Sequence, residues 1–168
     1  MTRYIVDASA SRVVVKARSS LHDTETRWTG LTGTIDADAA DLAGRTAAEV
    51  AVDMTRHDAG DFLRNRKLRK DLDVASFPRA HFRLAGVREV VERGGGRFAA
   101  VADGSIAWHG REVAIAAAGE GTIGRDELSA VARFELDVRR FGVEPPRFLM
   151  FKVEDVVSVE VSLVARRA

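Results

Sequence analysis

Hydrophobic and polar residues alternate with a period of two along most of this chain. Because successive side chains of a strand point to opposite faces, such alternation predicts β-strands with one buried face. The clearest stretch is near the end, where Val157, Val159, Val161 and Leu163 alternate with Ser158, Glu160 and Ser162. Similar stretches cover residues 12–18, 28–36, 49–54, 81–92, 97–108, 112–123 and 133–138.

Turn residues separate these stretches at the places where hairpins need them. Glycine supplies the positive φ of a tight turn, and Gly94-Gly95-Gly96, His109-Gly110 and residues 124–127 each join two alternating stretches. Strands joined without helices between them predict an antiparallel meander. About eight strands is the number at which a barrel closes around a small interior. We therefore expect an all-β fold, an eight-stranded antiparallel barrel, as one domain over residues 1–168.

Two segments depart from the alternation. Between Asp58 and Leu72, Asp58 or Asp61 is suited to cap a helix, and Leu68 and Leu72 lie one turn apart on one helical face. This predicts a single helix, with Phe77-Pro78 as its stop. The second segment is 139–152, where two consecutive prolines disfavour regular strand pairing.

Composition excludes several classes of site. The 26 Lys and Arg nearly balance the 25 Asp and Glu, and there is no cysteine, so disulfides, thiolate metal sites and a Cys nucleophile are excluded. The first residues run directly into strand-like sequence, without the apolar stretch of a signal peptide. No apolar run approaches the roughly 20 residues that span a bilayer. We expect a cytoplasmic protein without a transmembrane segment.

Four stretches of the sequence, in order, resemble one known family. They are residues 4–7 with 11–15, the Gly-containing stretch 28–35, residues 68–78 with Phe82, and Asp103-Gly104-Ser105-Ile106-Ala107-Trp108-His109-Gly110. Together they resemble the YceI-like family, also called polyisoprenoid-binding or lipocalin-like proteins. The resemblance implies an eight-stranded barrel with a helix beside its opening. It also implies that an amphipathic lipid, an isoprenoid-like or fatty chain, is held in the lumen.

Small residues at inward positions would leave room for such a ligand. One face of the strand at 113–119 is small-sided, and the facing run at 98–104 is similar. The alternative is that bulky neighbours fill this space as ordinary core, since the interior of an eight-stranded barrel can hold either side chains or a small ligand. The resemblance favours a cavity, and the expected ligand-binding residues are Phe62, Leu68, Leu72, Phe82, Phe98, Trp108, Ile115, Phe134, Leu136, Phe148 and Met150.

Basic residues gather in both irregular segments. If both flank one opening, cations there would neutralise a phosphate or carboxylate head group, with Arg forming bidentate bonds. The alternative is a solvated helix face balanced by nearby aspartates. Nucleic-acid binding is disfavoured because aromatic residues are not interleaved with the cations. The expected head-group residues are Arg64, Arg66, Lys67, Arg69, Arg139 and Arg140.

No catalytic motif accompanies these features, so we expect a non-catalytic binding protein with no cofactor and no metal. No pair of histidines has the helical spacing of a metal motif, and no Gly-x-Ser-x-Gly elbow is present. A weaker alternative is a barrel-mouth enzyme that uses His22 and His109, both in predicted turns. Another is a filled barrel that acts as a protein-interaction or stress-related module. The apolar run Phe148-Leu149-Met150-Phe151 is interpreted as a lip over the mouth, a loop under the helix, or a homodimer contact.

Overall fold

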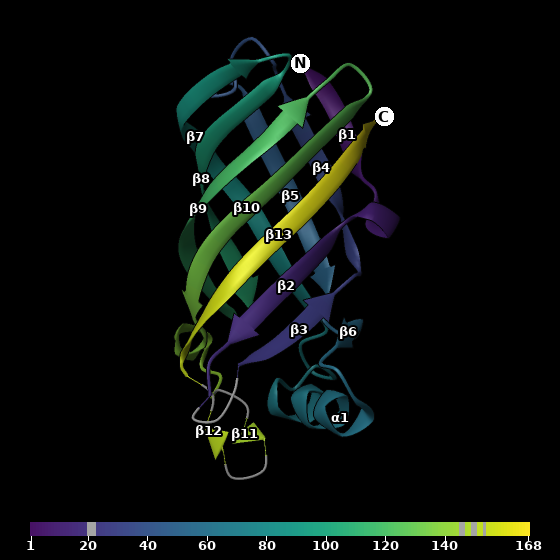
Figure 1. Ribbon diagram of the computed structural model, residues 1–168, viewed down its shortest axis with the longest axis vertical. Coiled ribbons are helices and arrows are strands. Elements are labelled where there is room, and N and C mark those ends of the chain that lie inside the picture. Colours follow the sequence, from purple (N-terminus) through teal and green to yellow (C-terminus); the bar gives the residue numbers. More distant parts are fainter. Residues whose placement is uncertain (20–22, 145–146, 149–150, 153) are drawn as a thin grey trace.

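A computed structural model describes residues 1–19, 23–144, 147–148, 151–152 and 154–168. One large antiparallel sheet forms the body of the molecule, and its strands follow the order β1-β4-β5-β7-β8-β9-β10-β13-β2-β3-β6. Because β1 pairs with both β4 and β13, the sheet closes on itself (Figure 1). Its strands are β1 (Thr2–Val6), β2 (Arg12–Ala17), β3 (Thr24–Trp28), β4 (Leu31–Ala37), β5 (Thr46–Asp53), β6 (His57–Asp58), β7 (Arg79–Gly94), β8 (Arg97–Trp108), β9 (Arg111–Ile123), β10 (Glu127–Asp137) and β13 (Val156–Arg167).

The closed sheet is an eight-stranded up-and-down barrel, as predicted. β1 and β2 lie end to end along β13, and β3 and β4 lie end to end along β2 and β1, so each pair acts as one long strand. The remaining long strands follow in chain order, each antiparallel to the next. The predicted strand over 28–36 is therefore wrong in its bounds: the structure breaks it at Thr29-Gly30 and extends it back to Thr24.

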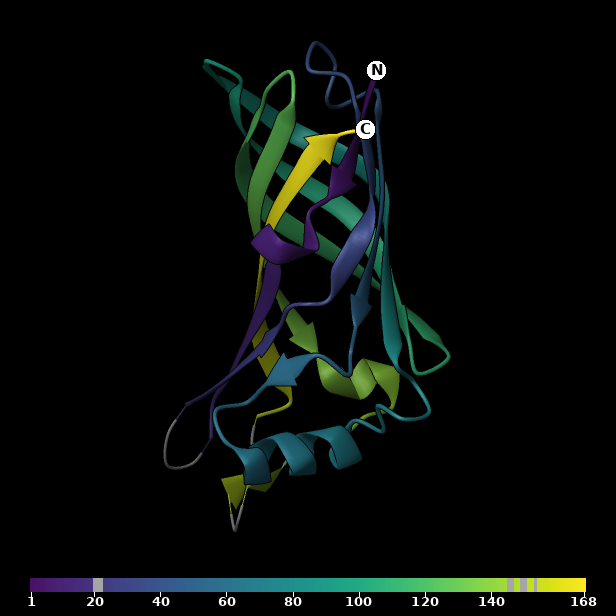
Figure 2. The same ribbon diagram turned by 90° about the vertical axis from the view of Figure 1, so that its right-hand side faces the viewer.

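The break between β1 and β2 is a short 3-10 helix, η1 (Ala8–Ala10), and a serine repairs the ladder beside it. The Ser11 hydroxyl accepts a hydrogen bond from the Val164 amide at 3.0 Å and donates to the Val164 carbonyl at 3.2 Å. A buried backbone group without a partner is costly, so this side chain replaces the missing strand partner. Figure 2 shows η1 as a short bend between β1 and β2.

The predicted hairpin glycines join β7 to β8. Gly94, Gly95 and Gly96 have φ of +82°, +64° and +78°, values that side-chain-bearing residues rarely adopt. The connection after β10 contains a second 3-10 helix, η2 (Val138–Phe141), and β11 (Arg147–Phe148) pairs with β12 (Phe151–Lys152).

One α-helix, α1 (Phe62–Asp71), lies across the end of the barrel opposite the chain termini (Figure 2). Asp61 caps it, since its carboxylate accepts a hydrogen bond from the Arg64 amide at 2.8 Å. Its end differs from the prediction, because Phe77-Pro78 does not stop it. Asp73 adopts a left-handed φ of +47°, and the Val74 amide donates to the Arg69 carbonyl, which closes a Schellman motif several residues earlier.

Two buried clusters fill the two ends of the barrel. The cluster near the chain termini contains Tyr4, Leu31, Ile35, Leu42, Ile123, Leu128 and Ala165 among others. The cluster at the α1 end contains Trp28, Met54, Leu68, Leu72, Val74, Trp108, Val113 and Phe141 among others. The apolar core is thus concentrated at the two ends of the barrel, and Val13 and Val52 pack against both clusters.

Candidate ligand-binding site

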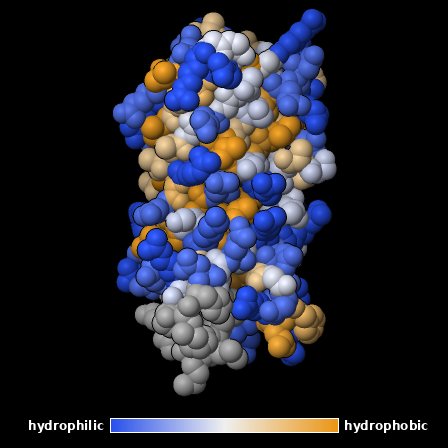
Figure 3. Space-filling model, in the orientation of Figure 1, coloured by the Kyte–Doolittle hydropathy of each residue, from blue (hydrophilic) through white to orange (hydrophobic). Residues whose placement is uncertain are grey.

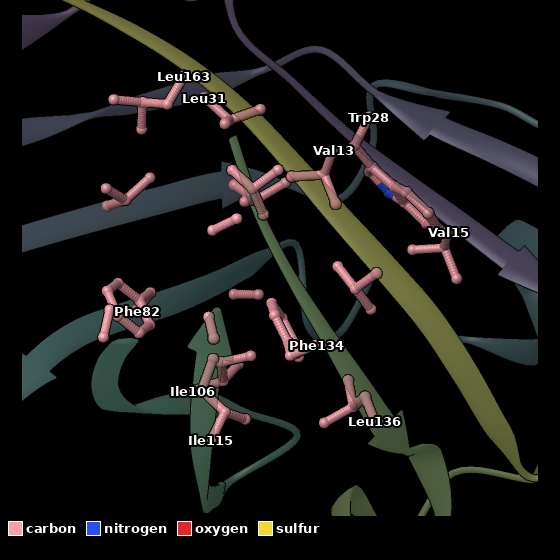
Figure 4. A pocket seen from close by; sticks show the side chains of 18 of the residues that line it. Val13, Val15, Trp28, Leu31, Phe82, Ile106, Ile115, Phe134, Leu136 and Leu163 are labelled. Carbon is pink, nitrogen blue, oxygen red and sulfur yellow. The ribbon is translucent and has the colours of Figure 1, made fainter. Parts of the chain in front are cut away.

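A cavity of about 390 Å³ occupies the barrel lumen. Figure 4 shows Val13, Ile106 and Phe134 pointing into it from different strands. Its volume falls within the roughly 300–1,000 Å³ of small-molecule sites. The structure therefore favours the hollow interpretation of the barrel over the filled one.

The middle of the lumen is lined by residues that pack into neither end cluster. Ile115, Ala132 and Phe134 line the cavity, yet none belongs to the buried clusters or to the residues packed against them. All three face inward but remain only half-buried. A side chain that points inward and still has accessible surface lies next to empty space. The barrel is therefore hollow at the level of these three residues, which we call the belt.

Gly104 makes room for an aromatic side chain in the same belt. A Cβ on Gly104 would lie 2.5 Å from the carbonyl oxygen of Arg83 and 2.5 Å from the ring of Phe82. The ring of Phe82 therefore lies flat against the wall where no side chain stands. This placement leaves the centre of the lumen open.

Helix α1 closes the far end of the cavity with two leucines. Leu68 and Leu72 both line the cavity and are buried. Nε2 of His109, in the turn between β8 and β9, donates to the Leu72 carbonyl at 2.8 Å. The His109 ring also stacks on Phe77, with centroids 4.1 Å apart, and the Trp108 indole N–H donates to the Phe77 carbonyl at 3.2 Å. These contacts tie the C-terminal end of α1 and the segment after it to the β8–β9 hairpin.

The start of α1 is tied to the barrel through His57 of β6. Its Nδ1 lies 3.0 Å from the Met54 carbonyl oxygen, and its Nε2 lies 3.2 Å from the Asn65 carbonyl oxygen of the helix. The Asn65 side chain in turn accepts a hydrogen bond from the Ala59 amide. The helix is therefore held at both ends while its middle covers the cavity.

Polar lining residues concentrate at the α1 end. Thr24 and Thr26 of β3 and the exposed Glu154, just before β13, all border the cavity there. Thr24 donates to the Ala17 carbonyl across the β2–β3 pair at 3.4 Å. The lumen is consequently almost wholly apolar, and its few polar lining residues, apart from Thr46, lie toward the α1 end.

Most of the expected ligand-binding residues lie around this cavity. Phe62 does not: it is 76% exposed and is not among the lining residues, so its expected place in the lumen is wrong. Met150 and the side chain of Phe148 lie outside the described residues. The expected residues that line the cavity are Leu68, Leu72, Phe82, Phe98, Trp108, Ile115, Phe134 and Leu136.

None of the six expected head-group cations lines the cavity. Lys67 pairs with Asp71 at 3.0 Å, and Arg64 pairs with Asp61 at 3.5 Å. Arg139 pairs with Asp137 and Asp155 at 2.8 and 3.3 Å. Hydrogen bonds from Arg139 hold the pKa of the Asp137 carboxyl below its usual value. Arg66, Arg69 and Arg140 are exposed.

The described residues show no metal-type cluster of three or more His, Asp or Glu side chains. The expected pair of His22 and His109 stays untested, since His22 lies outside the described part of the chain. Within that part, no helix is both long enough and apolar enough to cross a bilayer.

Sequence reasoning missed part of the lining, on the strands that precede α1. Val15, Trp28, Leu31, Val52 and Met54 all border the cavity. Their signal was the same period of two that identified the strands. Val15, Trp28, Leu31 and Val52 share the parity of the other lining residues of their strands, and Met54 continues the parity of β5 by one step. Extending the inward set to every strand would have found them.

Comparison with known proteins gives one family and several similar folds. A model of the family described as YceI-like domain matches residues 4–165. The crystal structure of BcnA from Burkholderia cenocepacia is 20% identical, with a TM-score of 0.77 over 95% of this chain and 98% of the other. A polyisoprenoid binding domain from Saccharophagus degradans, implicated in plant cell wall breakdown, is 15% identical, with a TM-score of 0.77 over the full length of both chains.

A third similar structure, the YceI protein of Campylobacter jejuni, is 12% identical, with a TM-score of 0.64 over 85% of this chain and 84% of that one. A search of curated proteins found no match. At these identities the solved structures support the fold alone. The family model, which matches nearly the whole chain, shows membership of the family of YceI-like domains.

Proposed function

We propose that this chain, which belongs to the family of YceI-like domains, binds and carries an amphipathic lipid of the isoprenoid or fatty class in its lumen. The observation that carries the proposal is the apolar cavity of about 390 Å³ in the barrel lumen, lined by residues of both end clusters and of the belt between them. We place the apolar chain of the ligand along the middle of the lumen. Its polar end lies beneath α1, beside Thr24, Thr26 and Glu154.

The shape of the cavity suits a chain better than a compact molecule. On β13 the lining residues run from Val157 to Leu163, which corresponds to roughly 20 Å along the strand at about 3.4 Å per residue. A long apolar space of this kind is matched by a flexible hydrocarbon chain. Apolar burial at roughly 25 cal/mol per Å² would supply the affinity.

The proposal is for carriage without chemistry. The lumen is lined almost entirely by apolar side chains, and the ring of His109 is used in contacts that hold α1. The similar domain from Saccharophagus degradans is described as polyisoprenoid binding, which supports the same ligand class for this chain.

The experiment is lipid detection in the purified protein, followed by uptake of a defined probe. Native mass spectrometry and organic extraction should reveal a co-purifying lipid, and the delipidated protein should take up a fluorescent fatty-acid analogue saturably, near one molecule per chain. A homogeneous protein that carries no lipid and takes up no probe would overturn the proposal.

A further inference from the structure

The outer face of α1 combines two large apolar side chains with three cations. Phe62 and Leu63 are 76% and 72% exposed, among the most exposed large apolar residues of the described chain. Arg66, Arg69 and Lys70 are exposed on the same helix. In Figure 3 a hydrophobic patch stands out over α1, at the lower right, beside strongly hydrophilic surface. We call these five residues the outer face of α1.

Helical geometry places all five together. At about 100° per residue they fall within a sector of roughly 120°, opposite the side that carries the buried Leu68 and Leu72. Because those leucines fix the helix against the cavity, the outer face is directed away from the barrel. Figure 2 shows α1 lying across the end of the barrel, where this face and the paired strands β11 and β12 together form the end surface of the molecule.

Charge is also sorted around the helix. Arg64 and Lys67 lie outside the sector of the outer face and are paired with Asp61 and Asp71. Arg66, Arg69 and Lys70 have no carboxylate within 4.0 Å among the described residues, and no acidic residue lies on the outer face. The aspartates thus pair with cations outside the outer face, which stays cationic.

We propose that the outer face of α1 docks on an anionic bilayer surface. Cations at such a surface are attracted to anionic lipid head groups, and apolar side chains beside them insert at the head-group boundary. A nucleic acid would need the cations but would give the apolar pair of Phe62 and Leu63 no favourable place. A membrane surface satisfies both, which is why it is the preferred partner.

This inference rests on the proposed function for its purpose. Leu68 and Leu72 of the α1 region close one end of the cavity, so docking through the outer face of α1 would place that end of the lumen against the membrane. Lipid could then pass between bilayer and barrel without crossing water. The docking itself does not require the lumen to be occupied, so the two proposals can be tested separately.

The test compares binding to vesicles of phosphatidylcholine alone with binding to vesicles that also contain phosphatidylglycerol, an anionic lipid that gives the surface a negative potential. One variant, R66Q/R69Q/K70Q, removes the three cations, and a second, F62A/L63A, removes the apolar pair. The control, R45Q/R125Q/R167Q, removes three exposed cations from the loops and strand end on the side of the chain termini. It changes the net charge by the same amount.

We expect the wild type and the control to bind anionic vesicles and to bind neutral ones much more weakly. The cation variant should lose about tenfold or more in vesicle affinity, as should the wild type at 1 M salt, where the Debye length is only about 3 Å. The apolar variant should lose vesicle affinity at low salt and at 1 M salt. Equal binding by wild type and cation variant, or equal losses in cation variant and control, would overturn the proposal.

Uptake of the fatty-acid analogue from solution separates this inference from the proposed function. If every variant takes up the probe but the α1 variants bind vesicles as tightly as the wild type, the docking proposal fails and the carriage proposal stands. If no probe is taken up but vesicle binding depends on α1, carriage fails and docking stands. Circular dichroism of each variant confirms that the barrel is folded, and no change is expected because the substituted side chains are exposed.

Discussion

Filling the hollow belt with one aromatic ring should separate ligand binding from stability. Ala132 lines the middle of the cavity on β10, beside Phe134, and packs into neither end cluster. A benzene-sized ring occupies a cavity of roughly 150 Å³. The substitution Ala132→Phe would therefore use a large share of the 390 Å³ lumen.

The effect on binding follows from the apolar contacts that the ligand loses. A ring at this position displaces about four methylene groups, each contributing about 0.8 kcal/mol when buried. The loss of about 3 kcal/mol corresponds to an affinity lower by about 100-fold or more. Stability should not fall, because the new ring buries apolar surface in space that is already empty.

Two measurements on the same delipidated samples check this reasoning. Titration with the fluorescent fatty-acid analogue gives the affinity, and urea denaturation gives the free energy of unfolding. Val131→Phe is the matched control: it places the same ring on the same strand but outside the lumen, so probe affinity should stay at the wild-type value.

A filled barrel makes the opposite prediction. Overpacking a filled core costs about 1–3 kcal/mol. If Ala132→Phe lowers the free energy of unfolding by that amount while probe affinity is unchanged, the lumen is not hollow and the probe binds elsewhere.

Three further predictions concern the walls and the lid of the lumen. Leu68→Ala should lower the free energy of unfolding, measured by urea denaturation, by about 2–3 kcal/mol, because Leu68 is buried. It should also speed probe release in stopped-flow displacement, because Leu68 anchors α1 over the cavity. An unchanged release rate would show that α1 does not control release from the lumen. Gly104→Val should lower the thermal midpoint and probe affinity together, because the new side chain would overlap the ring of Phe82, and an unchanged midpoint would contradict that placement. Hydrogen bonds, chiefly from the Thr55 hydroxyl, lower the pKa of Asp53 in the folded state. The contribution of Asp53 to stability is therefore present above the unfolded pKa of about 4 and is lost as the pH falls through the lower folded pKa. Asp53→Asn should reduce the urea midpoint at pH 7 more than near pH 2, and an equal reduction at both pH values would refute this reasoning.

The strands of this barrel could be predicted because their inner faces are apolar and their outer faces polar. The parity of Phe134 and Leu136 on β10, or of Ile115 on β9, is readable directly, and those residues line the cavity. The breaks in the first two strands were not predictable in this way. They depend on contacts between distant segments, such as that of Ser11 with Val164, 153 positions away.

Local signals also misplaced features of the helix. Proline after Phe77 is a general stop, but the helix had already ended at a left-handed Asp73, a conformation that no local pattern demanded. Phe62 was expected among the ligand-binding residues together with Leu68 and Leu72, but it is exposed. In the helix that Asp61 caps, the buried Leu68 and Leu72 face the barrel, and helical geometry places Phe62 on the outer face, away from them.

The pairing of the first strand with the last has a consequence for how the molecule folds. β1 and β13 close the sheet, and ion pairing between Asp7 and Arg166 joins positions 159 residues apart. Contacts of such high sequence separation form late, because loop-closure entropy must be overcome first. During synthesis β10 and β1 therefore have unpaired edges until the last strand leaves the ribosome. Loss of the final strand would leave both edges open, and aggregation rather than a smaller barrel is the expected result.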